Sequence, residues 1–152
     1  MGKEFKYVEN NVVMNRQYDE QIGIDFIPNQ IKIVDFTNLN YGEKKCLYAL
    51  SVVAFDYSNN YTFKNYEEGK ISLFKDGDIW QVYAVLDGKA YYPTCFLNLY
   101  EACEELLKNM MIDELLISFN NIVQSRIDED VINKYIEELT EKYQEKQKNK
   151  SL

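Results

Sequence analysis

Two Asp-Gly dipeptides constrain this chain more than any other feature. Asp76-Gly77 and Asp87-Gly88 interrupt a run of alternating apolar and polar residues over 70–92. An Asp-Gly pair between two such runs is the strongest short-range hairpin signal, because a type I′ turn needs positive φ at both central residues and glycine adopts it at no steric cost. The sequence therefore predicts a three-stranded antiparallel meander over 70–92, in which each Asp-Gly pair is a two-residue loop.

The two loops together predict one register. The first places Leu73 opposite Trp80, and the second places Leu86 opposite Lys89. Because side chains alternate between the faces of a strand, one face becomes wholly apolar or aromatic. Its residues are Ile71, Leu73, Trp80, Val82, Ala84, Leu86 and Tyr91. We expect this face, with Trp80 in it, to line the core, and the mixed opposite face to be either partly wet or covered by another element.

A helix is predicted directly after the meander. Pro93 lacks a backbone donor and is expected to end the last strand. Asn98 can cap the helix, and Glu101 three residues later completes a capping box. The apolar residues that follow recur at the helical spacing of one stripe. They are Leu99, Ala102, Cys103, Leu106, Leu107 and Met110.

Two more apolar stripes predict helices near 112–125 and 128–143, with a break near Met110-Met111 and with Asp128 as the last cap. The chain from about residue 144 has no apolar face, so we expect that tail to fray.

The N-terminal half gives weaker signals. Gln30–Phe36 alternates and is rich in β-branched residues, which predicts a strand. Residues 45–57 are apolar nearly all round, and periodicity cannot separate a doubly buried strand from a buried helix. The sequence favours a central strand there, because the turn cluster Ser58–Asn60 would let Tyr61–Phe63 pair back. The pieces at 5–8 and 12–14 fit a hairpin or a short helix.

These elements predict one α+β domain over residues 1–152. An antiparallel sheet, made of the meander 70–92 and N-terminal strands, would be packed by C-terminal helices near 98–110, 112–125 and 128–143. The chain is long enough to form a core without disulfide or metal staples. Its three cysteines form no close pair and are expected to be reduced.

Composition argues against ordinary catalysis. The chain contains no histidine, which excludes Ser-His and Cys-His nucleophiles and the common zinc sites. No glycine-rich phosphate loop can be built from its six well-separated glycines. Asp76 with Asp78, or Asp128–Asp130, could in principle bind a hard cation, but all of them are explained as turn or helix-start residues. We therefore expect a protein that is not an enzyme and has no cofactor or metal.

The net charge of −8 indicates the kind of partner. An acidic chain repels phosphate backbones, so direct nucleic-acid binding is not expected, and the complementary partner is basic. The sequence shows neither a cleavable leader nor a run of about 20 apolar residues. We expect a cytoplasmic protein without a membrane partner.

Nine residues are candidates for contact with a protein partner. Tyrosine combines rigid apolar area with a polar tip and is enriched at interfaces, which points to Tyr83 and Tyr92 on the mixed face of the meander. The acidic candidates lie in the turns and on the helices. They are Asp76, Asp78, Asp87, Glu104, Glu105, Asp113 and Glu114.

About a quarter of the chain resembles a known protein family. The run Ile71-Ser-Leu-Phe-Lys-Asp-Gly-Asp-Ile-Trp-Gln-Val-Tyr83, then Asp87-Gly-Lys89, then Phe96-Leu-Asn-Leu-Tyr-Glu-Ala-Cys-Glu-Glu-Leu-Leu107 is similar to a pattern in bacterial polymorphic-toxin immunity proteins. Asp87 stands where many members have a basic residue. The resemblance implies a small cytoplasmic antidote that binds and blocks a cognate secreted toxin. A basic toxin would suit an acidic antidote, because complementary fields speed encounter.

A second function remains open at this point. A phage or mobile-element anti-defence protein could inhibit a host effector by placing acidic helices in its nucleic-acid groove. That function needs a clustered acidic stripe, whereas the acidic residues of this sequence are scattered.

Overall fold

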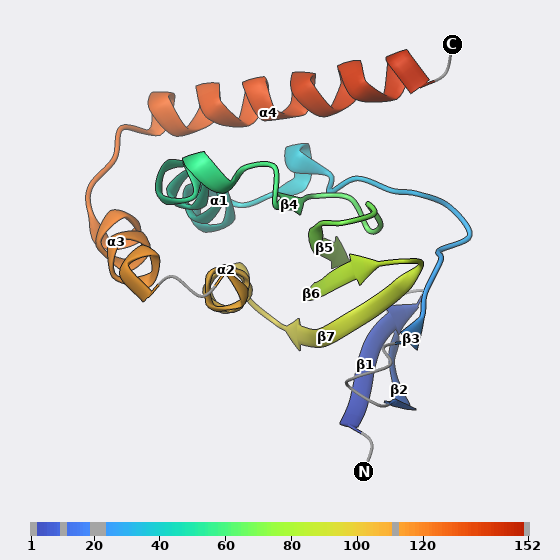
Figure 1. The fold of residues 1–152 in the computed structure, drawn as a ribbon. Coiled ribbons are helices and arrows are strands. Elements are labelled where there is room, and N and C mark those ends of the chain that lie inside the picture. The colour runs from blue at the N-terminus through green and yellow to red at the C-terminus, as the bar shows by residue number, and fades with distance from the viewer. Residues whose placement is uncertain (1–2, 10–11, 19–23, 111–112, 151–152) are drawn as a thin grey trace.

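The structure is a computed structural model that describes residues 3–9, 12–18, 24–110 and 113–150 (Figure 1). The strands are β1 (Lys3–Glu9), β2 (Val12–Tyr18), β3 (Ile24–Asp25), β4 (Tyr61–Thr62), β5 (Ile71–Asp76), β6 (Ile79–Leu86) and β7 (Lys89–Phe96). The helices are α1 (Tyr41–Val53), α2 (Leu99–Asn109), α3 (Asp113–Gln124) and α4 (Glu129–Lys150), with short 3₁₀ turns η1 (Phe36–Asn38) and η2 (Phe55–Tyr57).

The predicted α+β class is confirmed. A five-stranded sheet has the order β3-β7-β6-β5-β4, and β1 pairs with β2 in a separate hairpin. All pairs are antiparallel except β4-β5, so the sheet is mixed rather than purely antiparallel. Helices α1, α2 and α3 lie toward one end of the sheet, α4 runs across above α1 and the β4 region, and β7 runs from its turn back toward α2 (Figure 1).

The two predicted hairpins both form, but only the second has the predicted register. Leu86 pairs with Lys89 as expected. In the first hairpin Leu73 pairs with Val82 and not with Trp80, because Gly77-Asp78 and not Asp76-Gly77 forms the loop. The difference is two residues, so each side chain keeps its predicted face.

The prediction that Pro93 ends the last strand is wrong, because β7 continues to Phe96. The ladder between β6 and β7 slips between Val82 and Ala84, where Tyr92 and Pro93 together oppose Tyr83. This is a β-bulge, one of the few places where a sheet tolerates proline. Tyr92 has φ of 53°, an unusual backbone conformation for an aromatic residue.

The strand predicted over 45–57 is also wrong, because this segment belongs mainly to α1. Asn40 caps the helix by accepting from Glu43 N at 2.8 Å, and the Glu43 carboxylate accepts from Asn40 N at 3.1 Å. The segment is apolar on several sides because α1 contacts α2, α3 and α4 at once. Its buried residues are Cys46, Leu47, Ala49 and Leu50.

The predicted strand Gln30–Phe36 reduces to a single bridge between Ile33 and Lys64. The buried Asn65 amide replaces a ladder there: its Oδ1 accepts from Lys32 N at 2.8 Å, and its Nδ2 donates to Gln30 O at 3.0 Å. The segment can therefore stay extended without continuous strand pairing. Tyr61-Thr62 forms β4, and it pairs with β5 and not with residues 45–57.

The C-terminal helices form where the sequence predicted them, but α4 is longer than predicted, because the tail expected to fray from about residue 144 is helical to Lys150. Of the capping box predicted at the start of α2, the structure has the Asn98 half. Asn98 Oδ1 accepts from Glu101 N at 2.8 Å at the start of α2, and Asp128 Oδ1 accepts from Asp130 N at 2.9 Å at the start of α4. The backbone of α4 stays helical past Gln144 to Lys150, beyond its last buried side chain, Tyr143. Met111 and Ile112, in the predicted break and second stripe, lie outside the described residues.

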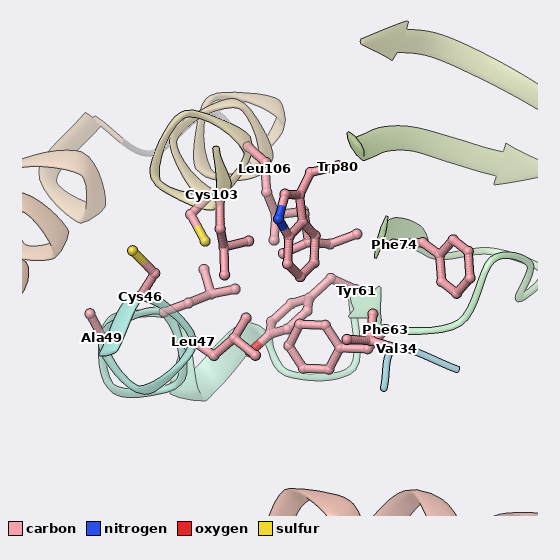
Figure 2. Close-up of a cluster of buried hydrophobic side chains, with 14 of the residues drawn as sticks. Val34, Cys46, Leu47, Ala49, Tyr61, Phe63, Phe74, Trp80, Cys103 and Leu106 are labelled. Carbon is pink, nitrogen blue, oxygen red and sulfur yellow. The ribbon is translucent and has the colours of Figure 1, made fainter. Parts of the chain in front are cut away.

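Trp80 is buried in the core, as predicted. Figure 2 shows its ring among side chains from α1, α2 and the β4 region. The Tyr143 hydroxyl accepts from Phe63 N at 2.9 Å and so connects α4 to the chain just after β4. On the opposite face of the sheet, Tyr83, Val85 and Ala90 form a second cluster with Phe26 and Tyr66, and β1 contacts β6 and β7.

Candidate functional site

Tyr83 does not belong to a contact surface, contrary to its nomination from the sequence. Its side chain is 1% exposed, and its hydroxyl donates to the carbonyl oxygen of Asn65. Burial raises the pKa of this phenol above its ordinary value. The mixed face of the meander is covered rather than open, so its tyrosine packs inside. Tyr92 differs, because the bulge leaves it 54% exposed.

The acidic candidates do not form one surface. Asp76 and Asp78 flank the β5–β6 turn, whereas Asp87 lies in the β6–β7 turn at the other end of β6. The eight residues of β6 separate the two turns by about 23 Å. We call these the Asp78 end (Asp76, Gly77, Asp78 and Leu97) and the Asp87 end (Ile27, Glu68, Leu86, Asp87 and Gly88).

The helical candidates lie elsewhere. Glu104 and Glu105 are half-buried on α2, and Glu114 is exposed in the first turn of α3. The side chain of Asp113 lies outside the described residues. The described side chains among these candidates therefore belong to two different helices.

Glu68 organises the Asp87 end. One carboxylate oxygen accepts from Asp87 N, and the other accepts from Gly88 N at 3.3 Å and from the Tyr66 hydroxyl at 3.3 Å. The backbone donors lower the pKa of the Glu68 carboxyl, the Asp87 N–H most strongly. Asp87 and Gly88 have φ of 53° and 74°, the pattern of a type I′ turn.

Two large apolar side chains lie in solvent on either side of this β6–β7 turn, whose backbone N–H groups donate to Glu68. Leu86 is 53% exposed and Ile27 is 73% exposed. Ile27 lies across Gly88, since a methyl group built on Gly88 would lie 3.7 Å from Ile27 Cδ1. The sequence placed Leu86 in the core, and this is wrong because α2, the helix that contacts β5, β6 and β7, lies at the other end of these strands (Figure 1).

The Asp78 end is connected to the interior instead. Leu97 is 82% exposed beside it. Behind the turn, Glu43 Oε2 accepts from Lys75 Nζ at 3.2 Å and from Trp80 Nε1 at 3.1 Å. Lys75 also lies 5.7 Å from the centre of the Trp80 ring. These contacts hold the first hairpin against α1.

A groove of about 550 Å³ lies between η1, α1 and α4. Phe36 and Ile136 contribute apolar surface to it, and Lys44, Glu137 and Glu141 contribute charges of both signs. The mixture gives it no strong preference for one ligand charge.

Two of the three cysteines are positioned as inert core residues. Cys46 on α1 and Cys103 on α2 are buried and free, and Figure 2 shows their sulfur atoms on facing sides of the helix interface. Burial raises the pKa of Cys46 to about 11 and that of Cys103 well above its ordinary value. Both side chains therefore stay as thiols near neutral pH, and the thiolate is the reactive form.

Within the described ranges, no three His, Cys, Asp or Glu side chains gather closely enough to hold a metal ion. In the same ranges, no helix combines the length and apolar character needed to cross a membrane. No protein-family model, curated protein or solved structure matches the chain.

Proposed function

We propose that the protein is an immunity protein that binds a cognate, basic protein toxin by direct contact and blocks it in the cytoplasm. The observation that carries the proposal is the Asp87 end. There, two exposed aliphatic side chains lie beside acidic ones at a turn that hydrogen bonds to Glu68 hold in place. Exposed apolar side chains with a polar rim are typical of protein interaction sites. The local resemblance to immunity proteins supports the same function.

The acidic charge fits the kinetics that an antidote needs. A net charge of −8 attracts a basic toxin over a distance of about 8 Å at physiological ionic strength. Such steering raises the association rate, and fast capture protects a cell before the toxin reaches its target.

The anti-defence alternative receives less support. Nucleic-acid mimicry needs a continuous acidic stripe, but the exposed acids of α4, among them Glu137, Glu138 and Glu141, share the helix with Lys134 and Lys142. An alternating charge pattern is typical of an ordinary solvent-facing helix.

Co-expression tests the proposal. We expect this protein to relieve the toxicity of the product of the gene immediately upstream, whereas an equally expressed variant with Leu86→Asp and Asp87→Lys would not relieve it. Growth is measured with each gene on its own inducible promoter. If the upstream product is harmless, or if its toxicity persists beside the wild-type protein, the proposal fails.

A further inference from the structure

We infer that the Asp87 end, rather than the Asp78 end, is the docking surface, and that its partner is a protein with an apolar socket rimmed by lysine or arginine. This inference rests on the proposed function and names the surface and the chemistry that the toxin must present. It follows from the position of the turn, its rigidity and its charge.

The position of the turn makes it accessible. The β6–β7 turn lies away from α1, α2 and α3 in Figure 1, whereas the opposite ends of these strands lie near α2. Leu86 precedes the turn and Ile27 lies across Gly88, so the turn is flanked by aliphatic groups from two separate segments. An apolar socket would remove both groups from water.

The turn is held in place before a partner arrives. Besides the Glu68 contacts, Phe26 N donates to Gly88 O at 3.0 Å. Gly69 N donates to Val85 O and Val85 N donates to Lys70 O, both at 2.9 Å. A surface that is already ordered loses little conformational entropy on binding, which leaves more of the contact energy as affinity. Glu68 is therefore a positioning residue.

The negative charge near the turn indicates which charge the partner carries around its apolar socket. Asp25, Glu68 and Asp87 place negative charge at this end of the sheet. Its basic residues include Lys89, opposite Asp25 in the sheet, and Lys70, whose charge is paired with Glu67 at 2.8 Å. A socket with a basic rim complements this arrangement, and an acidic rim would repel it. At the Asp78 end, by contrast, Glu43 directs its hydrogen bonds to Lys75 and Trp80 in the interior.

Matched variants at the two ends test the inference, with the purified upstream gene product as the binding probe. Leu86→Ser and Ile27→Ser should each weaken binding at least tenfold, and Leu97→Ser, at a leucine of the other end that is more exposed than either, should leave it within twofold. Asp87→Asn should reduce the association rate at low salt more than Asp78→Asn does. Asparagine suits position 87 because it tolerates positive φ.

A pH profile separates positioning by Glu68 from a merely structural role. Binding by the wild-type protein should fall as the pH drops through the folded-state pKa of Glu68, which the turn amides hold below its ordinary value of 4.5. Glu68→Gln should bind more weakly at neutral pH and lack this component of the profile.

The outcomes are distinct. If the wild-type protein binds and neutralises the probe but Leu97→Ser weakens binding more than Leu86→Ser, the surface is wrong and the proposed function stands. If the wild-type protein does not bind the probe, the proposed function fails and the inference fails with it. Tenfold or greater losses confined to the Asp87 end support both.

Discussion

The same dipeptide occurs in both turns of the meander and adopts two different geometries. Asp87-Gly88 has positive φ at both residues, 53° and 74°, as a type I′ turn requires. In the first turn only Gly77 is positive, at 62°, and the second central residue is Asp78. Positive φ at the first position alone is the pattern of a type II′ turn. The dipeptide thus predicts that a hairpin forms, but its surroundings decide where the chain reverses.

The side-chain contacts at the two turns also point in different directions. At the Asp78 end, Glu43 connects Lys75 and Trp80 to the start of α1, so the contacts point into the core. At the Asp87 end, Glu68 approaches from a neighbouring loop and leaves Leu86 in solvent. One end of the sheet is therefore tied to the core, and the other leaves exposed aliphatic side chains, where we propose that a partner docks.

Among the changes that test this difference between the two ends, removing the Glu43 side chain should have the largest effect on stability. Glu43→Ala deletes half of a capping box and leaves the buried Trp80 indole N–H without its acceptor, which should cost about 1–3 kcal/mol of unfolding free energy. Urea unfolding measures the change. Glu101→Ala is the matched control, because Glu101 is an exposed residue in the first turn of α2, and it should change stability by about 0.5 kcal/mol or less. Equal losses in the two variants would contradict the assigned role of Glu43.

Strengthening the local turn signal in the first hairpin should have a smaller effect, because we expect it to leave the register unchanged. Asp76→Asn creates Asn-Gly, which favours a type I′ loop at 76–77. That register would move Lys75 about 7 Å along the strand from Trp80 and separate the two partners of Glu43. We therefore expect the observed register to persist, with cross-strand nuclear Overhauser contacts between Lys75 and Trp80. Contacts between Leu73 and Trp80 would show that the dipeptide, and not Glu43, sets the register.

The pH dependence of the Asp87 turn should be the smallest effect. The folded-state pKa of Glu68 is lowered from 4.5 by the turn amides. Its contribution to stability is therefore fully present above pH 4.5 and is lost as the pH falls through the lower folded-state value. The difference in urea midpoint between wild type and Glu68→Gln should shrink between pH 6 and pH 3. If the difference in urea midpoint does not change over this interval, the Glu68 carboxylate does not stabilise the turn.

Local signals predicted the parts of the fold that depend on local physics. The second turn, the Asn98 cap and the buried stripe that begins at Leu99 are set by residues within a few positions of each other, and the structure has all three. Residues 45–57 could not be assigned by periodicity because α1 packs against three helices. Its capping box, Asn40 with Glu43, was present in the sequence and would have indicated the helix.

The candidate site depends on long-range contacts and was less predictable. Asp87 was nominated from its turn, but Glu68 reaches it from 19 residues away. Leu86 fits the core pattern of its strand, and its exposure follows from where the helical layer ends rather than from any neighbouring residue. Ile27 carries no signal of its own in the sequence, because its position opposite Gly88 depends on the pairing of β3 with β7.

Amide hydrogen exchange of the protein, free and bound to the upstream gene product, identifies the docking surface without any mutation. We predict that binding slows exchange in residues 25–27 and 84–91 and leaves residues 75–80 unchanged. Slower exchange confined to residues 75–80 and to Leu97 would contradict it, because the Asp78 end would then be the docking surface.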